Sequence, residues 1–386
     1  MVTYEQVENY IKQIGLKPFK TPDKFAIALA SKTDKAYARE VLNQLNARAQ
    51  GAPVSNKAFY ELKNQSLPGS LVISAAFDLG IFKRIGNLIV DSKDYFNGTV
   101  LDVGCDCGIV TCFMAKQYPH CKIVGVDVNA AAIENAKALA QRLELDNVEF
   151  VCDDIYEAGE CDYSVVTSFR CLLDITEKET KPLAFFGERA EREEQYCNAF
   201  ANYAKALADC LKDGGLLLSV ERYTAEYGWL GWLSALSANG VNADSNKCKI
   251  VGAADVSSRK EYSLTVLTKS PAEKTPLEVF DFVMSKNFKS GKACDGAQAE
   301  FALYKEAESD IQFTDVYKKE RLIHQYAFAK AADGYMAYDA SATKRKLTYF
   351  KDNKLDYVEK DYNSKLYLYK NNEIFSIKTY KITPKR

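Results

Sequence analysis

The feature that most constrains the fold is a stretch that begins at Thr99. The apolar run Thr99–Val103 predicts a buried parallel strand, and a short glycine-containing loop, residues 104–108, follows it. The next residues, Ile109–Gln117, have the spacing of a helix, and a second apolar run, Lys122–Val126, ends on Asp127. Strand, glycine loop, helix, strand and acid in this order indicate the first half of a nucleotide-binding βαβ unit.

The residue types of this unit have physical reasons. Glycines in the loop let the backbone approach a ligand that a Cβ atom would push away. The carboxylate of Asp127, at the tip of the second strand, can accept hydrogen bonds from both hydroxyls of a ribose. The dinucleotide fingerprint GxGxxG is excluded, because Gly104 and Gly108 do not stand at the spacing of its first and third glycines.

The same loop carries a family motif. The sequence resembles the class I S-adenosylmethionine-dependent methyltransferases, whose first motif has the form LDxGCGxG. The matching residues are Leu101, Asp102, Gly104, Cys105 and Gly108. The chain departs from the motif at Asp106, where the family usually has a middle glycine. This carboxylate either weakens binding of the cofactor or hydrogen-bonds its methionine amino group.

The resemblance implies S-adenosylmethionine as the cofactor, bound by the motif residues and Asp106. In the family, the acid after the second strand binds the ribose. The acid after the third strand binds the adenine amino group, the next residue packs on the ring, and the fourth strand ends beside the transferring methyl group. The further cofactor-binding residues implied here are Asp127, Val128, Asp153, Asp154, Ile155 and Ser168. Asp153 and Asp154 are alternatives for the adenine contact.

The chain divides where its composition changes. Residues 1–94 form a predicted helical region, 95–270 a predicted methyltransferase domain and 271–386 a predicted C-terminal domain, basic and rich in tyrosine. The predicted fold class is α/β, with a Rossmann-like seven-stranded methyltransferase sheet, an N-terminal helical segment and a C-terminal β-rich (α+β) domain. An antiparallel pair over 249–253 and 262–268 closes the predicted sheet.

Three helical segments are predicted before the glycine loop. They cover Tyr4–Gly15, Asp34–Ala49 and Ser70–Ile85, the last with a break or end at Gly80. The phrase AAFDLGIF in the third segment is similar to a helix of many small-molecule O-methyltransferases that supports dimerisation and the substrate pocket. The favoured alternative is a helix that simply covers the sheet, and a homodimer stays open.

The overall charge and the cysteines limit the class of protein. With a net charge of −1, no overall field attracts nucleic acid or an acidic membrane. The chain begins without the pattern of a signal peptide and contains no apolar run of about 20 residues, so we expect a cytoplasmic protein. The 11 cysteines are then reduced. Cys105 and Cys107 with only two histidines make a poor metal site, and no metal is predicted.

Catalytic candidates lie after the fourth and fifth predicted strands. Methyl transfer is an in-line displacement, so the protein aligns the acceptor and, for a hydroxyl acceptor, removes its proton. Glu221 or Tyr223 are candidate bases, and Arg170 or Arg222 could hold an acidic group of the acceptor. For each of them, a solvated or ion-paired residue at a strand end is the alternative.

A long polar segment, Asp174–Glu194, follows the fourth predicted strand and contains Phe185 and Phe186. Connections of this length are often functional, so one hypothesis is a lid that contributes aromatic rings to the substrate pocket. A solvated insertion is the equally weighted alternative.

Short alternating runs recur from Gly334 onward and predict an antiparallel meander. The runs are GYMAYDA, KLTYFKD, KLDYVEKD, KLYLYKN and EIFSIKTYKI. Residues 341–386 carry 12 Lys and Arg against 5 Asp and Glu. A basic sheet with tyrosines could stack bases and hold phosphates. In the favoured alternative the tyrosines fill one face and the lysines solubilise the other. The tyrosines are Tyr349, Tyr357, Tyr362, Tyr367, Tyr369 and Tyr380.

Three functions remain open from the sequence. The leading one is a methyltransferase acting on a small molecule or a protein side chain. The second is an RNA methyltransferase whose basic C-terminal domain delivers the substrate. The third, suggested by Asp106 and the lack of a clear base, is a catalytically silent cofactor-binding scaffold protein.

Overall fold

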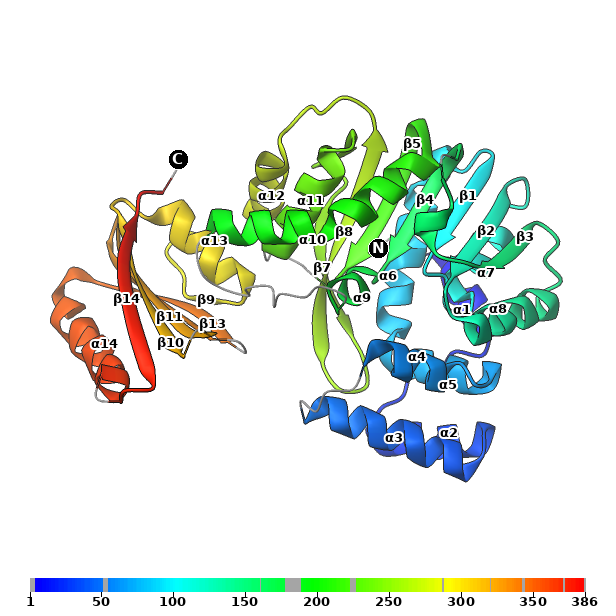
Figure 1. Ribbon diagram of the computed structural model, residues 1–386, viewed down its shortest axis with the longest axis horizontal. Coiled ribbons are helices and arrows are strands. Elements are labelled where there is room, and N and C mark those ends of the chain that lie inside the picture. The colour runs from blue at the N-terminus through cyan, green and yellow to red at the C-terminus, as the bar shows by residue number, and fades with distance from the viewer. Residues whose placement is uncertain are drawn as a thin grey trace. The chain divides into compact units, whose positions relative to one another are not determined.

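Figure 1 shows the computed structural model of the chain. It describes residues 4–50, 55–159, 161–177, 189–222, 227–286, 288–319, 321–341, 344–370 and 372–384. By their contacts the residues group into two compact units. The first holds Met1–Lys178, Phe200–Arg222 and Ala235–Glu273, and the second holds Glu179–Ala199, Tyr223–Ser234 and Lys274–Arg386. The division into three parts at residues 94 and 270 stays a prediction.

In the described part of residues 4–98, six α-helices and a short 3-10 helix, Lys93–Tyr95, precede the first strand. The α-helices are α1 (Glu5–Gln13), α2 (Pro22–Lys32), α3 (Lys35–Ala49), α4 (Asn56–Lys63), α5 (Leu67–Phe77) and α6 (Leu79–Asp91). The predicted helix after Asp34 is confirmed, because its carboxylate accepts the N–H groups of Ala36 and Tyr37 at the start of α3. Helices α2 and α4 were not predicted.

The predicted helical segment Ser70–Ile85 is helical apart from one residue, but its predicted break or end at Gly80 is misplaced. The chain breaks at Asp78, between α5 and α6, and Gly80 lies inside α6. A Cβ atom on Gly80 would come within 2.5 Å of the carbonyl oxygen of Ala254, in strand β7 (Lys249–Ala254). The glycine thus lets α6 pack on the sheet, as the favoured alternative held, and a part in dimerisation stays a prediction.

The first unit is built on a mostly parallel sheet. Its strands are β1 (Thr99–Val103), β2 (Lys122–Asp127), β3 (Val148–Cys152), β4 (Tyr163–Phe169), β5 (Leu211–Glu221), β6 (Val241–Ala243), β7 and β8 (Arg259–Lys269). The order is β3-β2-β1-β4-β5-β8-β6, with β8 antiparallel to β5 and β7 also paired to β8. Because β6 and β7 pair with opposite ends of β8, they share one edge position. The predicted Rossmann-like sheet is confirmed, but it has eight strands where seven were predicted, because the short strand β6 was not expected.

Helices connect the parallel strands. They are α7 (Ile109–Gln117), α8 (Ala130–Arg142), α9 (Leu172–Glu177) and α10 (Arg189–Cys210), and α11 (Tyr227–Ser237) follows β5. The Asn129 side chain accepts the N–H groups of Ala131 and Ala132 and so begins α8, as predicted. Apolar side chains of α1, α6, α7 and α8 form one buried core with those of the strands. This core packs the helices against the sheet, and the carboxyl ends of the parallel strands remain accessible to a ligand.

We expect Gly108→Ala to destabilise the first unit more than Gly240→Ala does. Both glycines have φ +77, so both variants bear the left-handed strain of about 1–2 kcal/mol. A Cβ atom on Gly108 would also lie 2.8 Å from the Cβ atom of Ala136, whereas nothing lies within 4 Å at Gly240. Urea unfolding of the two variants should differ by about 1–3 kcal/mol, the usual cost of overpacking. Equal losses would show that the contact between the loop and α8 is looser than described.

The second unit contains an antiparallel sheet with helices on both faces. Its strands are β9 (Cys294–Asp295), β10 (Ile311–Lys318), β11 (Arg321–Ala331), β12 (Gly334–Ser341), β13 (Lys344–Phe350) and β14 (Phe375–Ile382), in the order β14-β10-β11-β12-β13-β9. Three further helices are α12 (Pro276–Ser285), α13 (Ala297–Glu306) and α14 (Leu355–Lys370), and the first part of α10 and most of α11 also fall in this unit. Side chains of α13 pack on one face of the sheet and those of α14 on the other. Figure 1 shows these two helices beside the sheet.

The predicted meander is only partly right. Three of the runs form β12, β13 and β14, but KLDYVEKD and KLYLYKN form helix α14. Tyr362, Leu366 and Tyr369 pack toward the sheet at helical spacing, whereas Tyr357 and Tyr367 are 68% and 66% exposed. These exposed tyrosines added a false period of two to the sequence. The prediction of a sheet that carries all six tyrosines is therefore wrong.

Candidate active site

The first unit has a cavity of about 880 Å³ at the carboxyl ends of its parallel strands. Of the predicted cofactor-binding residues, Asp102, Gly104, Cys105, Asp106, Asp127, Val128, Asp153, Asp154 and Ile155 line it. Gly108 and Ser168 do not. Ser168 is fully buried, and its hydroxyl group lies 2.9 Å from that of Tyr203, which does line the cavity.

The carboxylate of Asp127 holds the glycine loop in place. Its two oxygens accept the backbone N–H groups of Asp106 and Asn129, each at 2.9 Å. The N–H groups of Gly104 and Cys105 both donate to the carbonyl oxygen of Val126. The loop is thus fixed to the end of β2 before any ligand binds. Burial and the nearby charge of Asp106 raise the pKa of Asp127 to about 6.

Asp102 lies beneath the loop as a buried floor. It is 2% exposed, and its carboxylate accepts the hydroxyl groups of Thr111 and Thr167, each at 2.6 Å. Burial raises the pKa of Asp102 to about 6, although the two hydroxyl groups act in the opposite direction. Asp102 therefore connects β1, α7 and β4 under the cavity.

Asp106 points its carboxylate at the N-terminal helices. Its backbone has φ +47, a left-handed conformation that Asp tolerates better than most residues. The carboxylate forms an ion pair with Lys63 and accepts a hydrogen bond from the Asn64 amide at 2.8 Å. Lys63 and Asn64 line the cavity, and sequence reasoning missed both. They lie about 40 residues before the loop and in no motif, so no local signal could have found them.

Arg170 also lines the cavity, and its backbone conformation is strained. Its backbone has φ +68, held by an N–H bond to the carbonyl oxygen of Val220 at 2.8 Å. The guanidinium pairs with Asp78, at the break between α5 and α6, and Lys63 approaches the same carboxylate at 3.9 Å. Lys63 and Asp78 are 3% and 7% exposed. A chain of alternating charges thus runs along the cavity, with Lys63 and Asp78 buried between the partly exposed Asp106 and Arg170.

Glu221, one of the two candidate bases, is not among the described residues that line the cavity. Glu221 is 1% exposed, and its oxygens accept the N–H groups of Cys171 and Leu172 at 3.2 and 3.3 Å. It therefore holds the start of α9, where Cys171 lines the cavity. Tyr223, Phe185 and Phe186 lie outside the described residues, so the base at Tyr223 and the lid hypothesis stay predictions.

We expect the stability of the protein to fall as the pH rises from about 6 to 8 and Glu221→Gln to flatten this dependence. Burial raises the pKa of Glu221 from 4.5 to about 8. In this window the folded state therefore holds a proton that the unfolded state has lost, so raising the pH favours unfolding, by about 2 kcal/mol in all. Urea midpoints at pH 6 and pH 8 measure the effect. The same slope in both proteins would mean that another group titrates.

The part of the chain that forms the glycine loop and the parallel strands matches a known domain family. The profile of a family described as a methyltransferase domain matches residues 96–226, which include the loop and β1 to β5. This domain belongs to the class I S-adenosylmethionine-dependent methyltransferases. The resemblance that the motif indicated is therefore confirmed, and the methyltransferase domain includes the glycine loop, Asp127 and Arg170.

Known relatives share parts of this methyltransferase domain. Ribosomal RNA small subunit methyltransferase C of Vibrio vulnificus is 32% identical over 126 residues, 32% of this chain and 35% of that protein. Malonyl-[acyl-carrier protein] O-methyltransferase of Acetivibrio thermocellus is 34% identical over 79 residues, 20% of this chain and 27% of that protein. The chain thus spans about a third or less of the length of these curated relatives.

Solved methyltransferase structures resemble the chain more weakly. The O-methyltransferase from the trans-AT PKS multienzyme of Brevibacillus brevis, in complex with S-adenosyl-L-homocysteine, has a TM-score of 0.37 and 14% identity over 53% of this chain and 77% of that one. Magnesium protoporphyrin IX methyltransferase of Synechocystis has a TM-score of 0.35 and 13% identity over 59% and 93%. Similarities with TM-scores this low give no evidence about the fold beyond the strand order described above.

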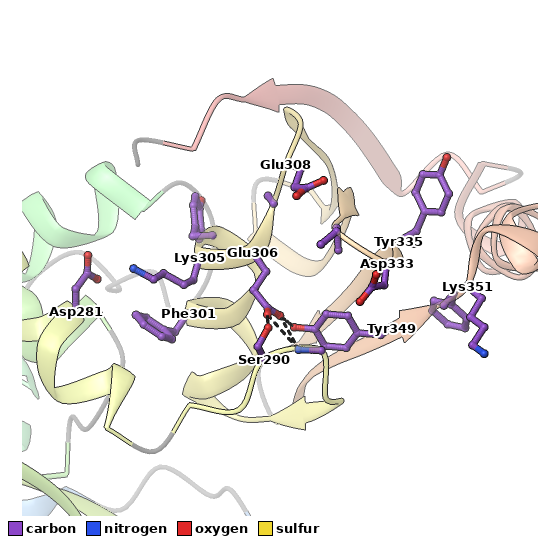
Figure 2. Close-up of a pocket in the computed structure, with 17 residues that line it drawn as sticks. Asp281, Ser290, Phe301, Lys305, Glu306, Glu308, Asp333, Tyr335, Tyr349 and Lys351 are labelled. Atoms are coloured by element: carbon purple, nitrogen blue, oxygen red, sulfur yellow. Dashed lines mark hydrogen bonds between the residues drawn. The ribbon is translucent and has the colours of Figure 1, made fainter.

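The second unit has a cavity of its own, of about 720 Å³, which Figure 2 shows. The carboxylate of Glu306, on α13, accepts the hydroxyl groups of Ser290 and Tyr349 and the N–H group of Gly291 at 3.1 Å. These contacts connect α13, β13 and the loop before β9. Because they occupy the Glu306 carboxylate, its role here is structural.

Among the residues that the structure describes, no group of three or more His, Cys, Asp or Glu side chains is arranged to hold a metal ion. No described helix is long and apolar enough to cross a membrane. The cysteines, Cys105 and Cys107 among them, are free thiols.

Proposed function

We propose that the protein is an S-adenosylmethionine-dependent methyltransferase that acts on a small molecule or a protein side chain. The observation that carries the proposal is the single cavity that borders both the glycine loop and Arg170. At about 880 Å³ it lies in the upper part of the range of ligand sites, which gives room for a cofactor and a small acceptor. The cofactor, when bound, supplies an electrophilic methyl group, and the residues of the chain bind the cofactor and orient the acceptor.

The cofactor half of the cavity suits a nucleoside. We assign the ribose to Asp127, whose carboxylate is already held by two backbone N–H groups. The adenine ring is assigned to Val128, Ile155 and one of Asp153 and Asp154. Val128 is 68% exposed, an apolar side chain at the cavity edge that a flat ring would cover.

The acceptor half suits a small group rather than a polymer. The aromatic side chains of Tyr60, Phe82, Phe169 and Tyr203 line the cavity. Outside the residues assigned to the cofactor, the charged lining residues are three acids and three bases, so this part of the cavity has no excess of positive charge to attract a chain of phosphates. They are Glu61, Asp78 and Asp174, and Lys57, Lys63 and Arg170. Arg170 is already paired with Asp78, so its proposed role is to orient the acceptor. Glu221 and Tyr223 stay the predicted candidates for a base.

An RNA acceptor is the second candidate. It is favoured by the names of the ribosomal RNA relatives and by the basic residues 341–386. Against it, strand β4 ends with Thr167, Ser168 and Phe169, and Arg170 follows. These residues do not form the Asn-Pro-Pro-Tyr signature of enzymes that methylate exocyclic amines of bases. The supposed stacking sheet is also lost, since four of its six tyrosines lie on α14.

The acceptor class can be tested with S-adenosylmethionine labelled in its methyl group. We expect the purified protein to transfer label to the protein or small-molecule fraction of a cell extract, with no loss on ribonuclease treatment. Label that ribonuclease releases would favour RNA instead. If S-adenosylhomocysteine gives no calorimetric signal with the wild-type protein at millimolar concentration, the silent scaffold is the better interpretation.

A further inference from the structure

Asp106 and Lys63 form a contact that the proposed function does not use. Lys63 is the last residue of α4, and its side chain is only 3% exposed. Its ammonium group pairs with the carboxylate of Asp106, which stands where the family motif has a glycine. Asn64 donates to the other oxygen of the same carboxylate at 2.8 Å. Both oxygens of Asp106 are thus bound by one turn of the N-terminal helical region.

This turn is itself held rigidly. The carbonyl oxygen of Lys63 accepts the hydroxyl groups of Tyr37 and Ser70, each at 3.0 Å. The Ser70 hydroxyl also contacts the side-chain oxygen of Asn64 at 2.8 Å, and the amide of Asn135, on α8, donates to the Asn64 carbonyl oxygen at 2.8 Å. Lys63 therefore approaches the loop from a fixed position, at little further entropic cost.

The charge of Lys63 matters because the loop is crowded with carboxylates. Asp102, Asp106 and Asp127 all line this end of the cavity. Burial alone would raise the pKa of Asp106, but the charge and hydrogen bond of Lys63, with the hydrogen bond of Asn64, lower it. Removing one partner of a buried ion pair leaves the other charge uncompensated, at a free-energy cost that is smaller for Asp106 because its side chain is 26% exposed. Without Lys63, Asp106 would have to move or take up a proton.

We propose that Lys63 is a positioning residue of the cofactor site, which fixes the glycine loop in its binding shape by pairing with Asp106. The inference rests on the proposed function, since it assumes that the loop binds the cofactor. It explains how the chain accommodates a carboxylate at the middle glycine of the motif. It also gives the N-terminal helical region a role in cofactor binding besides covering the sheet.

The test is a double-mutant cycle read by calorimetry with S-adenosylhomocysteine. We expect Lys63→Met and Asp106→Asn each to weaken binding tenfold or more. Lys63→Met leaves the Asp106 carboxylate without its cation, and Asp106→Asn leaves Lys63 with only the more distant carboxylate of Asp78, at 3.9 Å. The double variant should bind within about threefold of the wild type, since neither charge is left. Lys83→Met is the matched control, because it removes an ion pair between helices α1 and α6 whose residues do not line the cavity.

Each outcome of the double-mutant cycle supports or overturns the positioning role of Lys63. If wild-type protein binds and Lys63→Met binds equally well, or if the double variant is as weak as the single ones, the pair does not position the loop. If the wild type itself does not bind, the proposed function fails first and the inference with it. Should Lys63→Met not fold, as judged by circular dichroism, Asp106→Asn alone carries the test, and wild-type affinity in that variant overturns the proposal.

Discussion

Replacing Asp127 by alanine is expected to weaken the binding of S-adenosylhomocysteine a hundredfold or more. The variant loses the carboxylate that we assign to the ribose and, with it, the acceptor of the Asp106 and Asn129 N–H groups. Charge-assisted hydrogen bonds contribute about 1.5–3 kcal/mol each, so the loss of two corresponds to about two factors of ten or more. Calorimetry of wild-type and variant protein measures the change directly.

The pH dependence of the binding affinity tests the same contact in a second way. Since the pKa of Asp127 is about 6, the wild-type affinity should fall as the pH drops below 6, when the carboxylate takes up a proton and accepts less well. That fall should be absent in Asp127→Ala. Asp146→Ala, at an exposed residue before β3, removes the same charge elsewhere and should bind as the wild type does. A loss of affinity in both variants would point to overall charge instead of the ribose contact.

Replacing Asp78 by alanine is expected to lower the free energy of unfolding of the protein by about 3–5 kcal/mol, the cost of breaking a buried ion pair. Asp78 is 7% exposed and is the ion-pair partner of Arg170, so the variant leaves a buried guanidinium without its carboxylate. Lys63 is affected less, because Asp106 remains as its partner. Urea unfolding, followed by circular dichroism, measures the loss.

Two variants separate the buried charge from other effects of this change. Asp78→Ala combined with Arg170→Met should regain more than half of the lost free energy, since the unpaired cation is gone. Glu149→Ala breaks the pair with Lys122 on the surface, where the side chains are 57% and 62% exposed, and should cost less than about 1 kcal/mol. A double variant no more stable than Asp78→Ala would assign the loss to the packing of the break between α5 and α6.

The cofactor half of the site could be predicted because it is local in sequence. One strand, one loop and the next strand end contribute Asp102, the loop residues and Asp127 within 30 residues, and glycine and acid at this spacing leave few other folds. The strand order then follows from short right-handed connections between parallel strands. The remaining lining residues near Asp154 come from the third strand of the same sheet.

The charged residues across the cavity could not be predicted in this way. Lys63 and Asp78 come from helices that precede the sheet, and nothing in their local sequence shows that they approach Asp106 and Arg170. Their pairing depends on how helices pack, which periodicity does not encode. In the second unit the periodicity itself was misleading. The exposed tyrosines Tyr357 and Tyr367 gave helix α14 the alternating pattern of strands, and strands were therefore predicted there.

The central claim is that the loop after β1 and the carboxylate of Asp127 hold the nucleoside of the cofactor. A crystal of the wild-type protein soaked with S-adenosylhomocysteine tests it most directly. We predict density for the nucleoside in the cavity, with the ribose hydroxyl groups on Asp127 and the pair of Lys63 and Asp106 intact beside it. A cavity filled by the Asp106 side chain, with Asp127 turned away from the ligand, would contradict the claim.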